Sequence, residues 1–178
     1  MENNRKVVCY IATSVDGYIA TTEDSLDWLF KAAEGQEGDM GYAEFIATID
    51  TVVLGRRTYD WVMAAENGQF PYQDKMSYVF TSTVAEEHAF VTFTDQTVSD
   101  FVKALKEKSG KDIWVVGGSG LLHSFVEENL IDEWIISIAP VLLGKGIPLF
   151  KEVNVESSLK LKSVKSYGDF VQLHYKKL

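Results

Sequence analysis

The sequence has a single cysteine, so no disulfide bond can form within the chain. Cys9 stands in an apolar stretch and is expected to be a small core residue. The chain also lacks the run of about 18 apolar residues that a membrane-spanning helix needs. Its longest apolar run, from Trp134 to Leu143, is interrupted by Ser137 and Pro140. Residues 1–6 are polar and lack the layout of a secretory signal, so we expect a cytoplasmic protein.

Basic residues are too few to balance the acidic ones: 17 Lys and Arg stand against 26 Asp and Glu, a formal net charge of −9. This charge argues against nucleic acid and anionic membranes as partners, because both favour clustered Lys and Arg. It leaves room for an anionic small molecule, since a pocket can be basic on an acidic protein. The three histidines are scattered, and no Cys/His/Asp spacing indicates a metal site.

Prolines number only three, and no Gly/Ser-rich linker divides the 178 residues, so we expect one domain over residues 1–178. Short apolar runs predict strands at 7–13, 51–54, 76–80, 89–93, 113–116, 133–139 and 170–175. Helical spacing predicts helices at 40–49, 57–65 and 121–129, and another between Thr97 and Gly110. Residues 21–38 look irregular, with one helical turn near 26–29. Alternating strands and helices indicate a three-layer α/β fold, with a mixed, mostly parallel central sheet flanked by helices.

A glycine turn, Gly117-Gly118-Ser119-Gly120, joins a predicted strand to the helix that begins with Leu121 and Leu122. Glycines let a ligand approach the backbone closely, and a helix start offers unpaired N–H groups and a positive dipole end that suit a phosphate. The alternative is a tight turn with no ligand. The motif departs from the common dinucleotide fingerprint, because His123 stands where the third glycine belongs.

Two more polar clusters follow predicted strands. Gly55-Arg56-Arg57-Thr58 begins a helix, where arginine side chains can bind a phosphate in a bidentate manner. Thr81 and Ser82 place hydroxyls after the strand at 76–80. Each cluster alone has a simpler explanation, namely solvated arginines with a capping threonine, or an ordinary turn. Together with the glycine turn they gather at the carboxyl edge of the sheet, where open α/β sheets bind ligands.

The segments YIATSVDGYIA, DTVVLGRRTYDW, YVFTST and IWVVGGSGLLHSFVEENLIDEWIISIAPVLLGKGIPLF carry a family resemblance. They resemble the dihydrofolate reductase-like superfamily. More closely, they resemble the reductase domain at the C-terminus of the bifunctional riboflavin biosynthesis protein and its stand-alone relatives. The resemblance extends from Val7 to Tyr175. It implies an NADPH-dependent reductase of a small heteroaromatic or carbonyl substrate, pterin- or pyrimidine-like.

The resemblance also implies roles for individual residues. Arg56, Arg57 and Thr58, with Gly55, would meet the cofactor phosphates, and Thr81 and Ser82 would lie near the adenosine 2′-phosphate. Ala12, and the loop from Asp16 to Ala20 with Gly17 and Ile19, would border the nicotinamide. The pyrophosphate would be cradled by Gly117, Gly118, Ser119, Gly120, Leu121 and Leu122.

The proton donor has two candidates. Asp39 is favoured over Glu44 by an ungapped comparison with classical dihydrofolate reductases back from Gly55, but it also reads as a plain helix N-cap. Asp16 matches the riboflavin-type reductases, but it also reads as a turn residue beside Gly17. Because both assignments are open, a non-catalytic NADP(H)-binding protein of the same fold is a second hypothesis.

The resemblance further implies a homodimer. The apolar stretch 134–149 either supplies its interface or packs into the core.

Overall fold

The computed structural model describes residues 5–83 and 87–178, so the first four residues of the polar N-terminal segment lie outside the description. A central sheet of eight strands has the order β5-β4-β3-β6-β1-β7-β10-β9. From β5 to β7 every neighbouring pair is parallel, whereas β10 runs antiparallel to both β7 and β9. The predicted mixed, mostly parallel sheet is therefore confirmed. Its strands are β1 Val7–Ser14, β3 Ile49–Gly55, β4 Met76–Phe80, β5 Thr92–Thr94, β6 Asp112–Gly117, β7 Glu133–Ala139, β9 Leu159–Tyr167 and β10 Phe170–Lys177.

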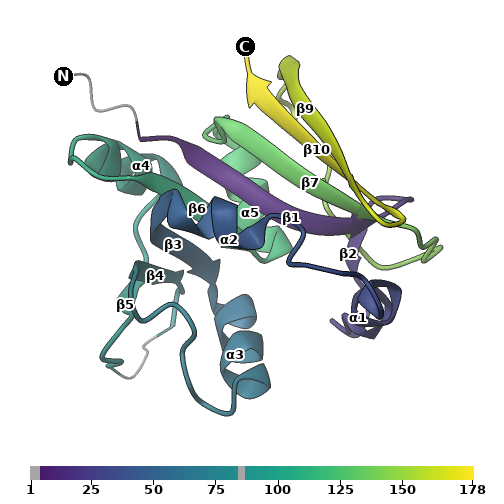
Figure 1. Cartoon of the computed structure of the whole chain (residues 1–178). Helices are drawn as coiled ribbons and strands as arrows, with labels where there is room; N and C mark the ends of the chain where they lie inside the picture. Colours follow the sequence, from purple (N-terminus) through teal and green to yellow (C-terminus); the bar gives the residue numbers. More distant parts are fainter. Residues whose placement is uncertain (1–4, 84–86) are drawn as a thin grey trace.

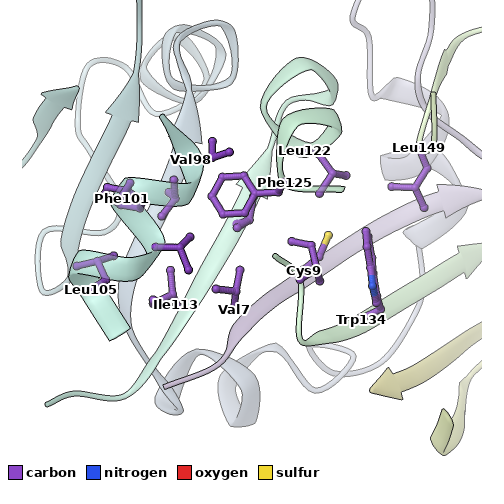
Figure 2. Close-up of a cluster of buried hydrophobic side chains, with 14 residues drawn as sticks. Val7, Cys9, Val98, Phe101, Leu105, Ile113, Leu122, Phe125, Trp134 and Leu149 are labelled. Carbon is purple, nitrogen blue, oxygen red and sulfur yellow. The ribbon is translucent and has the colours of Figure 1, made fainter. Parts of the chain in front are cut away.

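Helices cover both faces of this sheet, as Figure 1 shows, with α2 in front of the strands and α5 behind them. Successive side chains of β1 point to opposite faces of the sheet, so one strand contributes to the hydrophobic clusters on both faces. Val7 and Cys9 pack against α4 and α5 in the cluster of Figure 2, while Val8 packs with residues of α2 and α3. The helices are α1 Asp27–Ala33, α2 Tyr42–Ala47, α3 Arg56–Ala65, α4 Val98–Lys106 and α5 Ser119–Glu127.

Cys9 is fully buried in the hydrophobic cluster of Figure 2, and burial raises the pKa of its thiol. It is a core residue, as its apolar surroundings in the sequence predict. No described helix is long and apolar enough to cross a membrane.

A second, small sheet pairs β2 (Tyr18–Ala20) with β8 (Ile147–Pro148). It brings the turn after β1 next to the segment after β7. Val15 N donates to Val141 O at 2.9 Å, and Leu149 N donates to Gly17 O at 2.9 Å. These bonds fix one wall of the carboxyl edge of the main sheet.

Several elements differ from the sequence-based prediction. The strand expected at 89–93 is β5, which begins only at Thr92, and the single helical turn expected near 26–29 is the helix α1. The helix expected at 40–49 is shorter, because Gly41 takes a left-handed φ of 81° before it and Ile49 already belongs to β3. Strand β9 was not expected. It is an edge strand that pairs only with β10 in the sheet, and most of its residues are exposed. Its apolar residues alternate with lysines, and neither set is buried in the core.

Candidate functional site

A cleft of about 1350 Å³ opens at the carboxyl edge of the sheet. Its lining includes Gly55, Phe80 and Gly117, the last residues of β3, β4 and β6. The ends of parallel strands are where α/β sheets bind ligands. The three polar clusters expected from the sequence therefore lie in one cavity.

The turns that follow β3 and β6 lie against each other. Leu54 of β3 pairs with Gly117 of β6, and a Cβ atom built on Gly118 would lie 2.9 Å from the Thr58 hydroxyl oxygen. Gly55 and Gly118 are the N-caps of α3 and α5, and no described side chain caps either helix. Two helix starts with uncapped N–H groups thus meet in the cleft, an arrangement that suits a diphosphate.

The glycines of the second turn leave the backbone bare. Apart from the neighbouring residues in the chain and the backbone of α5, no described atom comes within 4 Å of a Cβ built on Gly117 or Gly120, and both residues line the cleft. Gly117 has a backbone φ of +126°, which residues other than glycine rarely adopt. Its peptide bond to Gly118 is cis. The turn is therefore open enough for a phosphate to reach its N–H groups, and the residues present fit a dinucleotide.

The two arginines at the start of α3 both line the cleft. Arg56 donates from Nε to Asp60 Oδ1 at 2.8 Å, and its guanidinium lies 6.0 Å from the centre of the Phe93 ring. Arg57 forms an ion pair with Asp24, in the loop between β2 and α1, while 77% of its side chain stays exposed. Such surface pairs are weak, so either guanidinium can exchange its carboxylate for a phosphate.

Thr81 and Ser82 line the far end of the cleft. Thr81 N donates to Thr94 O at 3.0 Å, which holds the end of β4 against β5. The neighbouring lining residues are also polar and come from the loop before α4, including Gln96 and Thr97. This part of the cleft offers hydroxyl and amide groups, and the carboxylates of Asp95 and Glu128 line it as well.

Most of the residues expected at a cofactor line the cleft. They are Ala12, Ile19, Gly55, Arg56, Arg57, Thr58, Thr81, Ser82, Gly117, Gly118, Ser119, Gly120 and Leu121. Leu122 is not among them, because its side chain is fully buried in the core under α5. Gly17 is also absent from the lining, since it closes the turn after β1 with its N–H donating to Ser14 O at 3.0 Å.

Neither carboxylate expected as proton donor lines the cleft. Asp16 accepts hydrogen bonds from Ser14 Oγ at 2.6 Å, Leu143 N at 3.1 Å and Gly144 N at 2.7 Å. The Ser14 bond, followed by these backbone bonds, lowers the pKa of Asp16. An acid that works near neutral pH needs a raised pKa, so this environment favours a structural carboxylate.

Asp39 is in a similar position. Its carboxylate accepts from Ala43 N at 2.6 Å and Gly41 N at 3.0 Å, and these two bonds lower its pKa. It is exposed and satisfies the first N–H groups of α2. The N-cap of α2 is Gly41 and not Asp39, so Asp39 instead stabilises the turn that leads into the helix.

One side of the cleft carries aromatic residues that the sequence did not single out. We call Tyr42, Trp61, Tyr72 and Trp114 the aromatic wall; all four line the cleft. Tyr42 belongs to α2 and Tyr72 to the loop before β4, and no local sequence motif marks either residue. Trp28 of α1 is absent from the lining; its Nε1 is buried and has no hydrogen-bond partner among the described residues. Its neighbours Leu26, Leu29 and Phe30 face the cleft instead.

Comparison with known proteins agrees with this architecture. The chain is 49% identical over 174 residues to the uncharacterized protein YwjB of Bacillus subtilis (strain 168), covering 96% of this chain and 97% of the relative. A crystal structure from Shewanella sp. PV-4, of a protein provisionally named for riboflavin biosynthesis, has a TM-score of 0.87 at 29% identity, over 97% of this chain and 99% of that chain. Dihydrofolate reductase from Enterococcus faecalis, complexed with NADP(H), shares the fold with a TM-score of 0.60 at 17% identity, over 97% and 96% of the two chains.

The resemblance noted in the sequence is thereby confirmed. The family model of the RibD C-terminal domain matches residues 5–173, and the chain belongs to this family.

Proposed function

We propose that this chain is an NADPH-dependent reductase of a small heteroaromatic or carbonyl substrate of the pterin or pyrimidine type. The observation that carries the proposal is the meeting of two uncapped helix starts at Gly55 and Gly118, beside the bare backbone of Gly117. Family membership and the likeness of the fold to an NADP(H)-bound dihydrofolate reductase support it. NADPH would supply the hydride, and the protein would bind the cofactor and orient it.

The residues that would hold the cofactor follow from the cleft. The N–H groups of Ser119 and Gly120 and the Thr58 hydroxyl would bind the pyrophosphate, and Arg56 and Arg57 would neutralise its charge. Thr81 and Ser82 would contact the adenosine 2′-phosphate. Ala12 and Ile19 line the cleft on the β1–β2 side, and would border the nicotinamide.

Titration with NADPH, followed by tryptophan fluorescence, tests cofactor binding, because Trp61 and Trp114 both line the cleft. We expect saturable quenching, and weaker binding of NADH if Thr81 and Ser82 contact the 2′-phosphate. Absence of binding at high micromolar NADPH would overturn the proposal.

A second candidate is an NADP(H)-binding protein without catalytic activity. The observation that favours it is that neither Asp16 nor Asp39 lines the cleft. It predicts tight NADPH binding with no oxidation in the presence of pterins, flavin precursors or dicarbonyls. Turnover of any of these compounds would reject it.

We also propose that two copies of the chain pair through one face of β7, β10 and β9. On this face Leu173 lies opposite Val164 and Tyr175 opposite Leu161, and no described helix covers Leu161 or Val164, which are 48% and 56% exposed. A second copy is the occupant we infer, since a two-fold axis places these four uncharged side chains against the same four of the partner. Within 134–149, Trp134, Ala139 and Leu149 are buried in the core, and on this face the stretch would add the partly buried residues Ile136 and Ile138.

A further inference from the structure

The Asp24 carboxylate is held in the cleft by a turn of its own backbone. Asp24 N donates to Thr21 O, and Thr21 N donates to Ser25 O, both at 3.1 Å. Ser25 N in turn donates to Thr21 Oγ1 at 3.0 Å. None of these bonds involves Arg57, so the carboxylate keeps its place when the Arg57 guanidinium moves to a phosphate. Asp24 is therefore a carboxylate at a fixed place in the lining of the cleft.

Aromatic side chains border this carboxylate. Its partner Arg57 stands one helical turn before Trp61 on α3, and residues one turn apart are neighbours on the same face of a helix. Trp61 lines the cleft and is 39% exposed. Phe30 of α1, the helix that follows Asp24, lines the cleft as well and is 56% exposed. A ligand beside Asp24 would thus contact open aromatic rings.

Few cationic side chains line the described part of the cleft. They are Arg56, Arg57 and Lys151. Arg56 donates to Asp60, and Lys151 follows Leu149, which packs into the cluster of Figure 2 on the α5 face of the sheet. Arg57 is therefore the lining cation that neutralises Asp24. If Arg57 binds a cofactor phosphate, Asp24 is left without this partner, and an uncompensated carboxylate favours a cationic ligand.

We propose that the substrate is a flat heterocyclic cation with its charge on the C=N⁺ bond to be reduced, bound between the Asp24 carboxylate and the aromatic wall. This inference rests on the proposed reductase function. The carbon of the C=N⁺ bond accepts a hydride from NADPH, which becomes NADP⁺. The π electrons of that bond become the lone pair of the nitrogen, so the product is a neutral amine. Atoms and charge balance without a proton, and the reaction therefore needs no acid such as Asp16 or Asp39, neither of which lines the cleft.

The chemistry of the cleft supports a cationic substrate. A positive charge over the face of Trp61 or Trp114 is attracted by the ring, most strongly where water is displaced. The net charge of −9 also attracts cations to the protein. The site depends on the cofactor, because the substrate competes with Arg57 for Asp24 until a cofactor phosphate holds the guanidinium. Each ligand should therefore strengthen the binding of the other.

Three two-ring probes test the inference. N-methyldihydroisoquinolinium has a C=N⁺ bond and can be reduced. N,N-dimethyltetrahydroisoquinolinium carries the same charge without that bond, so its binding can be measured in the presence of NADPH. N-methylisoquinolone is their neutral counterpart. Calorimetry would measure binding of the last two probes with and without NADPH, and the loss of NADPH absorbance would follow reduction of the first.

The variants are Asp24→Asn, Arg57→Gln and, as the matched control, Asp60→Asn. Asp60 also pairs with an arginine of α3 and directly precedes Trp61, but it does not line the cleft. Asparagine tolerates the left-handed φ of 62° at position 24, so Asp24→Asn should keep the turn.

In wild type, NADPH should strengthen binding of the dimethyl cation about tenfold, and binding of the neutral probe less. Asp24→Asn should weaken binding of this cation in the presence of NADPH about tenfold. It should raise KM for the reducible probe by the same factor with little change in kcat, because the hydride step takes no proton. Arg57→Gln should bind the dimethyl cation without NADPH as tightly as wild type does with it, and Asp60→Asn should behave as wild type.

Several results would overturn the inference. They are a wild-type protein that binds NADPH but not the dimethyl cation, a neutral probe that binds as tightly as the cation, and an Asp24→Asn variant with unchanged cation binding. A collapse of kcat in Asp24→Asn would make Asp24 an acid rather than the partner of a cation, and an equal loss in Asp60→Asn would assign the effect to net charge. Failure of NADPH itself to bind would instead overturn the proposed function, so the two failures are distinguishable.

Discussion

The Asp24 carboxylate and the Arg57 guanidinium form an ion pair although 33 residues separate them in the sequence. Both residues line the cleft. Asp24 stands in the loop before α1, a helix in which none of the seven described residues is buried. The pair therefore joins a weakly packed segment to the start of α3, and it occupies the guanidinium that a cofactor phosphate would use.

Competition for Arg57 gives the first prediction. Asp24→Asn should tighten NADPH binding a few-fold, because Arg57 no longer has to leave a carboxylate. Arg57→Gln should weaken it about tenfold, since a charge-assisted hydrogen bond contributes roughly 1.5 kcal/mol at such an exposed position. Fluorescence titration at fixed ionic strength measures both effects.

Lys160→Gln is the control for loss of one positive charge, because Lys160 is exposed on β9 and does not line the cleft. If this variant weakens NADPH binding as much as Arg57→Gln, the effect belongs to net charge and the role of Arg57 is wrong. If Asp24→Asn weakens binding, the carboxylate does not compete with the cofactor.

The sequence anticipated the glycine and arginine motifs that line the cleft better than it anticipated the aromatic wall. Gly117 to Gly120 and Gly55 to Thr58 are contiguous motifs whose backbone requirement is local, so their place at strand ends can be read from the residues. The aromatic wall has no such signature, because Tyr42, Tyr72 and Trp114 come from a helix, a loop and a strand. The packing of α2 and of the loop before β4 against Trp114 brings them together.

The proton-donor candidates show a similar limit. Asp16 and Asp39 could each be interpreted as an acid or as a local structural residue, and their burial and partners were needed to weigh the two. Strand β9 was missed for a different reason. An exposed edge strand carries neither the continuous apolar run of a buried strand nor a neighbour on its second side.

Asp16 gives the second prediction. Its carboxylate accepts the N–H groups of Leu143 and Gly144, so Asp16→Asn should speed hydrogen exchange of these two amides several-fold. Exchange monitored by NMR measures the effect. Asp39→Asn is the matched control, because Asp39 binds only N–H groups at the start of α2. Unchanged exchange at Leu143 and Gly144 in Asp16→Asn would contradict this positioning role.

The buried carboxylate of Glu133 gives a third prediction, on acid stability. Its oxygens accept from Lys162 Nζ at 3.0 and 3.1 Å, and lie 2.9 Å from Lys6 Nζ and 2.7 Å from His174 Nε2. Burial alone would raise the pKa of Glu133, but the hydrogen bonds from Lys6, Lys162 and His174 outweigh it and lower that pKa to about 2. A carboxylate with a lowered folded-state pKa stabilises the protein above its unfolded value of 4.5, and this contribution is lost as the pH falls from 4.5 towards 2.

Denaturant unfolding between pH 7 and pH 2 tests this. Glu133→Gln should lower the free energy of unfolding at pH 7 by about 3 kcal/mol, and should flatten its decline below pH 4.5. Glu156→Gln, which removes an exposed carboxylate, should keep the wild-type slope. Equal slopes in wild type and Glu133→Gln would show that another carboxylate dominates acid unfolding.

The exposed face of β9 and β10 gives the last prediction. Val164 is 56% exposed and lies opposite Leu173, on the face of β9 and β10 that also carries Leu161 and Tyr175. Val164→Lys places one ammonium from each copy in the proposed interface, where neither has a partner, so the dimer should dissociate. Light scattering at tens of micromolar protein should give a dimer for wild type and a monomer for Val164→Lys.

Lys165→Gln is the control, because the Lys165 side chain points to the other face of the sheet and its Nζ lies 3.6 Å from the Glu44 carboxylate. This variant should leave the dimer intact. A wild-type monomer at this concentration would contradict the pairing, and a dimer that persists in Val164→Lys would move the interface to another surface.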